Sequence, residues 1–300
     1  MPRRALFSLA AALAVGAARL DAQVAALNSD LWRVAAGTRA APAPFADGAT
    51  ALLWNPVVLL PAAADVRLGV TSIHAPEDVG VTGGAVAFSG RVGASVISAV
   101  WGSLGIGGIA RTETSPEAVD GDVPVDAQLL ALGLARPLAP WLQAGAALRI
   151  SSARLDVLTR TAAGLDLGAV AALSSRVRVG AVIRAFDPMG TAAASYDAAV
   201  EARSATFDGI GTPAFVRLRY GVTVQSGEDP AHLFTLGLCL GDGLQFDAGA
   251  AREAAADQVV WRSRVGVSAG SARYRVEFGR DGGVNGFGAT YAFGVLAQLK

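Results

Sequence analysis

The sequence lacks the features of soluble domains and of helical membrane proteins. Only 17% of its 300 residues are charged, whereas about a quarter is usual in soluble domains. Hydrophobic residues make up 52% of the chain, and the mean hydropathy is +0.43. After residue 20, however, no apolar run reaches the roughly 18 residues that a transmembrane helix needs. Because only helices and closed β-barrels span a bilayer, the sequence favours a barrel.

Other absences exclude whole classes of function. Cys239 is the single cysteine, so no internal disulfide can form, and we interpret it as a small strand residue. The 25 basic residues balance the 25 acidic ones, which gives no overall field for nucleic acid. Neither histidine, His74 or His232, has neighbours for a catalytic triad or a metal site. The acidic segment 120–126 lacks the pattern of an EF-hand loop. We expect no enzyme, no cofactor and no metal.

The first 22 residues resemble a secretory signal peptide. The chain begins with a basic MPRR, continues with a short apolar segment at 6–18, and offers a cleavage site after Ala22. The alternative is an N-terminal anchor helix, for which the apolar segment is too short. We therefore predict export, with 1–22 removed.

Beyond residue 64, apolar residues recur at every second position. In VRLRYGVTVQ, for example, Leu218 and Tyr220 share one face, and Arg217 and Arg219 share the other. Soluble sandwiches alternate as well. Here, though, the segments approach the 9–11 residues of a transmembrane strand, and many arginines occupy the polar face. An outer-membrane barrel explains both features, because its apolar face meets lipid and its polar face lines the lumen.

We therefore predict an all-β fold, in which residues 65–300 form a transmembrane antiparallel β-barrel of about 14 strands in the outer membrane, in contact with its lipid. Even strand numbers are usual in such barrels. One check fails, because the long links 115–124, 153–160 and 188–212 fall on the periplasmic side if both termini are periplasmic. We therefore expect that a strand has been split or missed before residue 125, and that another has been split or missed after residue 212. The predicted strands are 65–75, 79–90, 91–101, 104–114, 125–136, 141–152, 162–173, 176–187, 213–224, 231–241, 244–253, 258–269, 272–280 and 284–297.

Residues 23–64 precede the strands and form an apolar segment interrupted by prolines. Such backbone cannot lie in lipid with unsatisfied polar groups, but it can lie inside a protein-lined lumen. We predict that this segment, called the plug below, is a hatch in the barrel; the alternative is a loose periplasmic leader. Trp54, Asn55 and Pro56 are the candidate ligand or plug contacts, since Asn55 can bond neighbouring backbone and Pro56 fixes a turn.

The charged residues of the polar face are the candidate lumen lining. A lining rich in arginine could favour the passage of anions. Alternatively, the arginines pair with Asp166, Asp247, Glu277 and plug acids and so fix the structure, which zero net charge favours. The predicted lining consists of Arg149, Asp166, Arg178, Arg184, Arg217, Arg219, Asp247, Arg262, Arg264, Arg273, Arg275 and Glu277.

Several short segments resemble the PorV/PorQ family of FadL-like outer-membrane barrels. They are ATALLWNP at 49–56, ARPLAPWLQAGAALRI at 135–150, GLDLGAVAAL at 164–173 and FGATYAFGV at 287–295. Val57 departs from the alanine that usually follows Asn-Pro there. The resemblance implies a 14-stranded barrel with an N-terminal hatch. Members of this group include long-chain fatty-acid transporters and the PorV component of type IX secretion, a shuttle for secreted proteins.

Three functions are compatible with these features. The first is the binding or transport of small hydrophobic molecules across the outer membrane, which predicts an apolar pocket between hatch and wall. The second is a partner or shuttle role in a type IX-like secretion system, which predicts a closed lumen and protein partners. The third is a plugged structural barrel without transport. We favour the first, and the ligand or cargo stays open.

Overall fold

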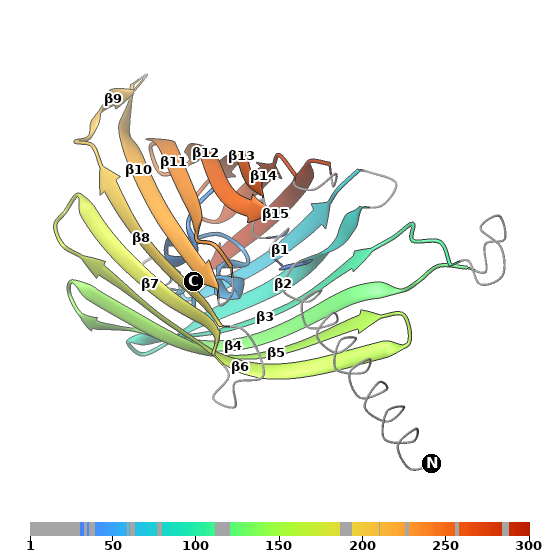
Figure 1. Ribbon diagram of the computed structural model, residues 1–300. Helices are drawn as coiled ribbons and strands as arrows, with labels where there is room; N and C mark the ends of the chain where they lie inside the picture. Colours follow the sequence, from blue (N-terminus) through green and yellow to red (C-terminus); the bar gives the residue numbers. More distant parts are fainter. Residues whose placement is uncertain are drawn as a thin grey trace, which may run out of the picture.

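A closed antiparallel barrel dominates the molecule (Figure 1). The computed structural model describes residues 31–32, 35, 40–58, 60, 64–76, 80–111, 121–186, 194–209, 211–225, 228–255, 258–283 and 288–300. Within this part, 14 strands form the closed ring and one more lies beside it. Each ring strand pairs with the next one along the chain, β8 with β10, and β15 closes on β1.

The ring strands have these bounds: β1 Val66–His74, β2 Val81–Val92, β3 Ser95–Ile106, β4 Val125–Ala139, β5 Leu142–Leu155, β6 Leu158–Ala172, β7 Val177–Phe186, β8 Ser195–Arg203, β10 Thr212–Gln225, β11 Ala231–Leu240, β12 Leu244–Ala255, β13 Gln258–Gly270, β14 Tyr274–Asp281 and β15 Thr290–Leu299. The additional strand, β9 (Phe207–Gly209), pairs with the first residues of β10. Strand β9 extends the hairpin of β8 and β10 beyond the end of the barrel (Figure 1). No helix among the described residues is long and apolar enough to cross a membrane.

Alternation along the strands places apolar side chains outside. On β4, Leu132 and Leu134 are half exposed, whereas Ala131 before them and Ala135 after them are buried in the interior. The same pattern brings large apolar side chains to the outside around the ring, among them Leu68, Val70, Phe88, Ile97, Trp101, Leu148, Leu218, Phe234, Leu236, Phe278 and Phe293. Burial of such a belt in lipid removes apolar surface from water. The prediction of an outer-membrane barrel is confirmed.

The links between strands define the orientation of the barrel. On the side where β1 begins and β15 ends, hereafter the near rim, the links β2–β3, β4–β5, β6–β7, β11–β12 and β13–β14 are short turns, and the link β8–β10 carries the short strand β9. The longest link, residues 107–124, lies on the opposite side, hereafter the far rim. Short turns are periplasmic and long loops external in such barrels. The near rim is therefore the periplasmic one, and the failed check on the predicted strands is resolved.

Two errors in the predicted strands cancel in the total. The segments 91–101 and 104–114 are not separate strands, because β2 continues to Val92, a two-residue turn follows, and β3 runs from Ser95 to Ile106. Conversely, the predicted link 188–212 contains β8. The missed strand thus lies before residue 212, whereas we expected it after that position. Each error alone shifts later strands to the wrong rim, which is why the long links fell on the periplasmic side.

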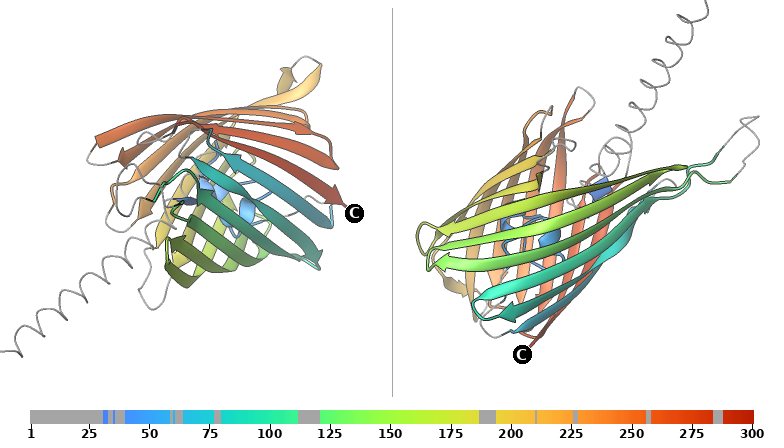
Figure 2. Two further views of the ribbon diagram at one scale, coloured as in Figure 1. Left: turned by 90° about the vertical axis from the view of Figure 1, so that its right-hand side faces the viewer. Right: turned by 90° about the horizontal axis from the view of Figure 1, so that it is seen from below.

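The plug lies inside the ring of strands, as both views in Figure 2 show for its described part. Residues 40–58 fold into two short 3-10 helices, η1 (Ala43–Phe45) and η2 (Ala51–Leu53), and most of their side chains are buried. Leu52, Leu53 and Trp54 join one buried apolar cluster with wall residues of β3 and β4. The hatch interpretation agrees with this placement. The predicted signal peptide at 1–22 and residues 23–30 lie outside the described residues.

Candidate functional site

The wall lacks side chains where the plug backbone comes closest to it. A methyl group on Gly145 of β5 would lie 2.3 Å from the Pro56 carbonyl oxygen, and one on Gly180 of β7 would lie 2.7 Å from the Pro44 Cβ. Glycine permits this close approach because it has no Cβ. Further wall glycines that face the plug are Gly69, Gly102, Gly133, Gly168, Gly221 and Gly266. These positions together form the seat of the plug.

Asn55 joins two parts of the plug. Its Nδ2 donates to the Pro44 carbonyl at 2.7 Å, and its Oδ1 accepts from the Val57 N–H at 2.9 Å. Asn55 is buried, so both bonds satisfy backbone groups that water cannot reach. Pro56 lies against Gly168 of β6. The predicted contacts of Asn55 with neighbouring backbone are therefore present in the structure.

Two arginines of the wall reach the plug at its second 3-10 helix. Arg149 of β5 donates to the Leu53 carbonyl at 2.8 Å and also forms a two-pronged ion pair with Asp166 of β6. The guanidinium of Arg184 lies over the Trp54 ring, 5.9 Å from its centroid. Arg149 thus connects the end of η2 to two neighbouring strands.

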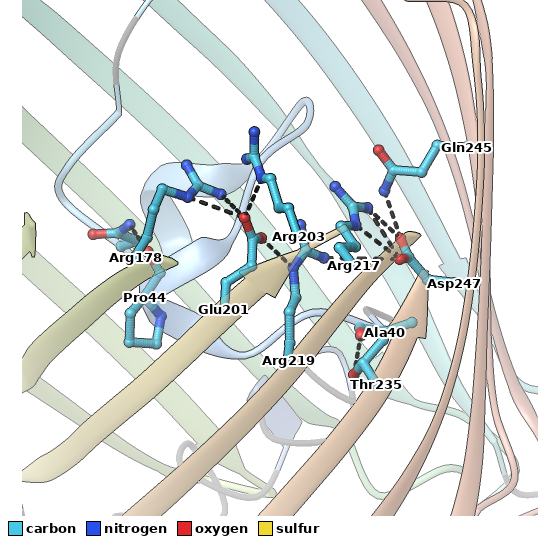
Figure 3. Close-up of polar contacts among 11 residues, drawn as sticks. Ala40, Pro44, Arg178, Glu201, Arg203, Arg217, Arg219, Thr235, Gln245 and Asp247 are labelled. Atoms are coloured by element: carbon cyan, nitrogen blue, oxygen red, sulfur yellow. Dashed lines mark hydrogen bonds and ion pairs between the residues drawn. The ribbon is translucent and has the colours of Figure 1, made fainter. Parts of the chain in front are cut away.

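Glu201 of β8 is the centre of a buried charge network (Figure 3). Its Oε1 accepts from Arg178 at 2.7 Å and from Arg203 at 2.6 Å, and its Oε2 accepts from Arg219 at 2.7 Å. The carboxylate is fully buried. Three cations around one anion form a network that crosses β7, β8 and β10.

The network continues toward β12 through Asp247. The Arg217 guanidinium donates to both carboxylate oxygens of Asp247, with the shorter contact at 2.8 Å, and Gln245 donates to the same carboxylate. Arg219 comes within 3.8 Å of it. Figure 3 shows these residues side by side, with Ala40 of the plug and Thr235 of β11 below them. Hydrogen-bonded ion pairs of this kind offset the loss of hydration of buried charges.

Two further ion-pair networks connect neighbouring strands on the inner face of the wall. On β13, Arg262 and Arg264 both bind Glu253 of β12 and Asp281 of β14, with the Asp281 contacts at 2.9 and 3.0 Å. Separately, Arg184 of β7 binds Asp197 of β8 at 2.9 Å. Most arginines of the predicted lining are therefore paired with acids of neighbouring strands. This geometry favours the structural interpretation over an anion path.

The remaining members of the predicted lining differ from this pattern. Arg273 lies in the exposed β13–β14 turn, outside the strands. Glu277 faces inward, but its Oε2 accepts from the Ala49 N–H of the plug at 3.2 Å. Arg275 faces inward beside it on β14. The predicted lining did not include four acids that pair with its arginines, Asp197, Glu201, Glu253 and Asp281. Asp197 and Glu201 could have been found, because SYDAAVEAR alternates with period two and places both on one face.

A cavity of about 110 Å³ separates part of the plug from the wall strands β1, β2 and β12 to β15. Leu53, Trp54 and Ile73 contribute apolar surface to it, whereas Asp47 and Glu277 contribute carboxylates. The cavity therefore has an apolar and a polar part. This mixture of apolar lining and few polar groups is typical of small-molecule sites.

Asp47 belongs to the plug and is one of the charged residues that line this cavity. Its side chain keeps accessible surface toward the lumen, although the wall encloses it. Enclosure raises the pKa of the Asp47 carboxyl, but nearby guanidinium groups lower it by more, so the pKa lies below its ordinary value of 3.8. These groups belong to Arg219, Arg217, Arg275 and Arg67.

Comparisons with known proteins identify the fold. No family model and no curated protein sequence matches the chain. Among solved structures, the toluene transporter TbuX of Ralstonia pickettii is 13% identical with a TM-score of 0.53, over 84% of this chain and 94% of that one. The Pseudomonas putida toluene transporter TodX is 10% identical (TM-score 0.53; 87% and 95% covered), and the monoaromatic hydrocarbon channel CymD is 13% identical (0.53; 89% and 97%).

These similarities define the fold of the protein. The chain shares the closed barrel fold of the three structures. They are transporters or channels by name. None of the comparisons distinguishes the PorV/PorQ family, which stays a prediction.

Proposed function

We propose that the protein binds small hydrophobic molecules in the cavity between plug and wall and passes them across the outer membrane. The observation that carries the proposal is the cavity itself, which lies between the part of the plug around Trp54 and the strands that close the barrel. The fold shared with structures named as toluene transporters and a hydrocarbon channel supports it. The ligand is expected to be small and largely apolar.

The size of the cavity limits the ligand. An engineered apolar cavity of about 150 Å³ binds benzene, whereas the cavity here measures about 110 Å³. A single-ring hydrocarbon or a short alkyl chain therefore enters only if the plug shifts slightly. Such a shift is local, because the wall networks at Glu201, Asp247 and Asp281 connect strands to each other and do not depend on the plug.

The charges in the lumen support an uncharged ligand. Arg178, Arg217, Arg219, Arg262 and Arg264 each bind at least one carboxylate. An anion that moved along this wall would have to displace those carboxylates, and it would leave them buried without partners. A hydrocarbon makes no such demand.

Filling the cavity tests the proposal. Ala46 of the plug lines the cavity, so Ala46→Leu should reduce the uptake of toluene by protein-containing vesicles. Ala171→Leu is the matched control, because Ala171 lies on the lipid-facing side of β6. Equal toluene uptake by both variants and by the wild type would refute the cavity as the site.

Mass spectrometry of the intact protein, extracted in mild detergent, separates this function from the secretion-partner alternative. A stoichiometric apolar ligand supports the binding proposal. Stoichiometric protein partners without a ligand would support a role in secretion instead, as the PorV/PorQ resemblance implies.

A further inference from the structure

Two arginines point outward from the barrel, where lipid is expected. Arg252 lies on β12 in register with His232 of β11 and Trp261 of β13, and Trp261 is one of the most exposed large side chains of the barrel. Ala251, which precedes Arg252 on β12, is fully buried on the inner face. Arg280 lies on β14 between the inward residues Gly279 and Asp281. Both guanidinium groups therefore emerge on the lipid side.

These two arginines differ from the other outward-facing arginines of the described strands. Arg154 on β5 has an acid beside it, since Asp126 binds it at 2.7 Å. Arg136 lies near the end of β4 at the near rim. By contrast, Arg280 contacts only the Ser263 hydroxyl at 3.4 Å among the described residues. For Arg252, the structure gives no hydrogen bond or ion pair within the part of the chain that it describes.

Both arginines lie close to the far rim. Arg280 is the penultimate residue of β14, and Arg252 lies three residues before the end of β12. An arginine on the lipid face is unfavourable by about 2–4 kcal/mol at the midplane of a membrane, but only by about 0–1 kcal/mol near the interface. Their position therefore places the two guanidinium groups at the depth of lipid headgroups in the outer leaflet.

We propose that this surface binds the phosphorylated headgroup of an outer-leaflet lipid. Arg252 and Arg280 flank β13, so their strands are about 10 Å apart. Their partners on β13, Trp261 and Val265, are four residues apart, but the Arg280 guanidinium reaches back to Ser263 between them. The two arginine side chains can therefore hold two phosphates of one headgroup. Arginine is well suited to phosphate because its donors form a planar fork. Tyr220, whose hydroxyl is hydrogen-bonded to His232 Nδ1 at 2.8 Å, adds a polar group and aromatic surface beside the arginines.

The surface toward the near rim fits the acyl chains of such a lipid. Below the arginines, the outward residues are apolar and exposed, among them Phe234, Leu236, Val276 and Phe278. A free anion would contact only the arginines, whereas a lipid would also cover this apolar surface. The combination of two cations at the headgroup depth and an apolar surface beneath them favours a lipid over a free phosphate. The proposal does not depend on whether the barrel transports hydrocarbons.

Titration of the intact protein with lipid A, a diphosphorylated and acylated disaccharide, tests this site by native mass spectrometry in detergent. The double variant Arg252→Gln/Arg280→Gln should weaken binding roughly tenfold or more, as expected for lost charged hydrogen bonds. Arg136→Gln should bind like the wild type, because it removes an outward arginine at the opposite rim. Arg252→Lys/Arg280→Lys should retain part of the affinity for lipid A. Such a result would show that positive charge at these positions contributes to binding.

Three results would overturn the proposal. They are equal lipid A binding by the double Gln variant and the wild type, equal binding of a neutral dialkyl glycolipid, and displacement of lipid A by inorganic phosphate at equal concentration. A heated and an unheated gel sample confirm that each variant is a folded barrel before binding is measured. If the double Gln variant does not fold, the two single variants are compared with Arg136→Gln in the same way.

Discussion

At the scale of single residues, carboxylates of neighbouring strands determine how the lumenal arginines behave. Alternation along the sequence predicts that Arg217 and Arg219 face inward, and they do. It could not predict Glu201, the partner of Arg219, because the alanine-rich segment SYDAAVEAR around it was assigned to a link. Which residues lie opposite each other on neighbouring strands depends on contacts far apart in the sequence. Until that register is known, the arginines of one face can be either unpaired or neutralised by carboxylates.

Removal of the central carboxylate should destabilise the barrel. Glu201→Gln leaves Arg219, which is almost fully buried, without its main partner, and loss of one partner of a buried pair costs about 3–5 kcal/mol. Arg178 and Arg203 are one-third exposed, so water screens part of their loss. We therefore expect the free energy of unfolding to fall by an amount near the lower end of this range, about 3 kcal/mol. Denaturant unfolding of the protein in lipid vesicles measures it.

The control for this variant is an exposed pair on the outside of the same barrel. Asp126→Asn removes the partner of Arg154, and both side chains are substantially accessible. Its effect should stay below about 1 kcal/mol. If the two variants were equally stable, the buried network would contribute no more than a surface pair.

Asp47 should make the seating of the plug depend on acid. Its pKa in the folded protein lies below the ordinary value of 3.8, so the charged form is favoured in the fold. The stability that it contributes is fully present above pH 3.8 and is lost as the pH falls through the lower, folded value. Protease cleavage within the plug should therefore increase below about pH 4 in the wild type. In Asp47→Asn, cleavage should depend less on pH. If cleavage of the variant and of the wild type had the same pH profile, Asp47 would not control the seating of the plug.

At the scale of elements, strand length and alternation were sufficient for most of the barrel. The strands with large outward side chains, such as β4 and β10, were found close to their true bounds. Segments rich in glycine and alanine were not, because they offer little contrast between the two faces; β8 was missed and the region of β2 and β3 was divided wrongly. The seat of the plug was also invisible, since a glycine that faces a plug and a glycine in a turn look alike in sequence.

A single methyl group in this seat should disturb the plug. Gly145→Ala would bring a Cβ to 2.3 Å from the Pro56 carbonyl oxygen, which is backbone and cannot rotate away. Overpacking of this kind costs about 1–3 kcal/mol, and here the plug can yield more easily than the wall. The expected result is a higher conductance in planar bilayers with an intact barrel.

Gly107→Ala serves as the matched control for Gly145→Ala. Nothing lies within 4 Å of a methyl group at Gly107, and a change without such contacts is usually within about 0.5 kcal/mol of neutral. The conductance of this variant should equal that of the wild type. A similar rise in both variants would show that the effect comes from the loss of glycine and not from contact with the plug.

At the scale of the whole molecule, the barrel and the plug are held by different interactions. The wall is connected by backbone pairing all around the ring and by ion pairs between neighbouring strands. The plug is held by apolar packing, by close backbone contact at the glycine seat, and by few polar contacts, such as those from Arg149 and Glu277. This division implies that the wall can close without the plug.

Deletion of residues 23–64 should therefore leave a folded barrel with an open lumen. Folding is checked by the difference in gel mobility between heated and unheated samples, which should match that of the full chain. Conductance of potassium chloride in planar bilayers should rise well above that of the full chain, because the apolar plug no longer fills the lumen beside β3 and β4. A folded barrel with unchanged conductance would mean that wall side chains close the lumen. Failure to fold would mean that the plug is an essential part of the core.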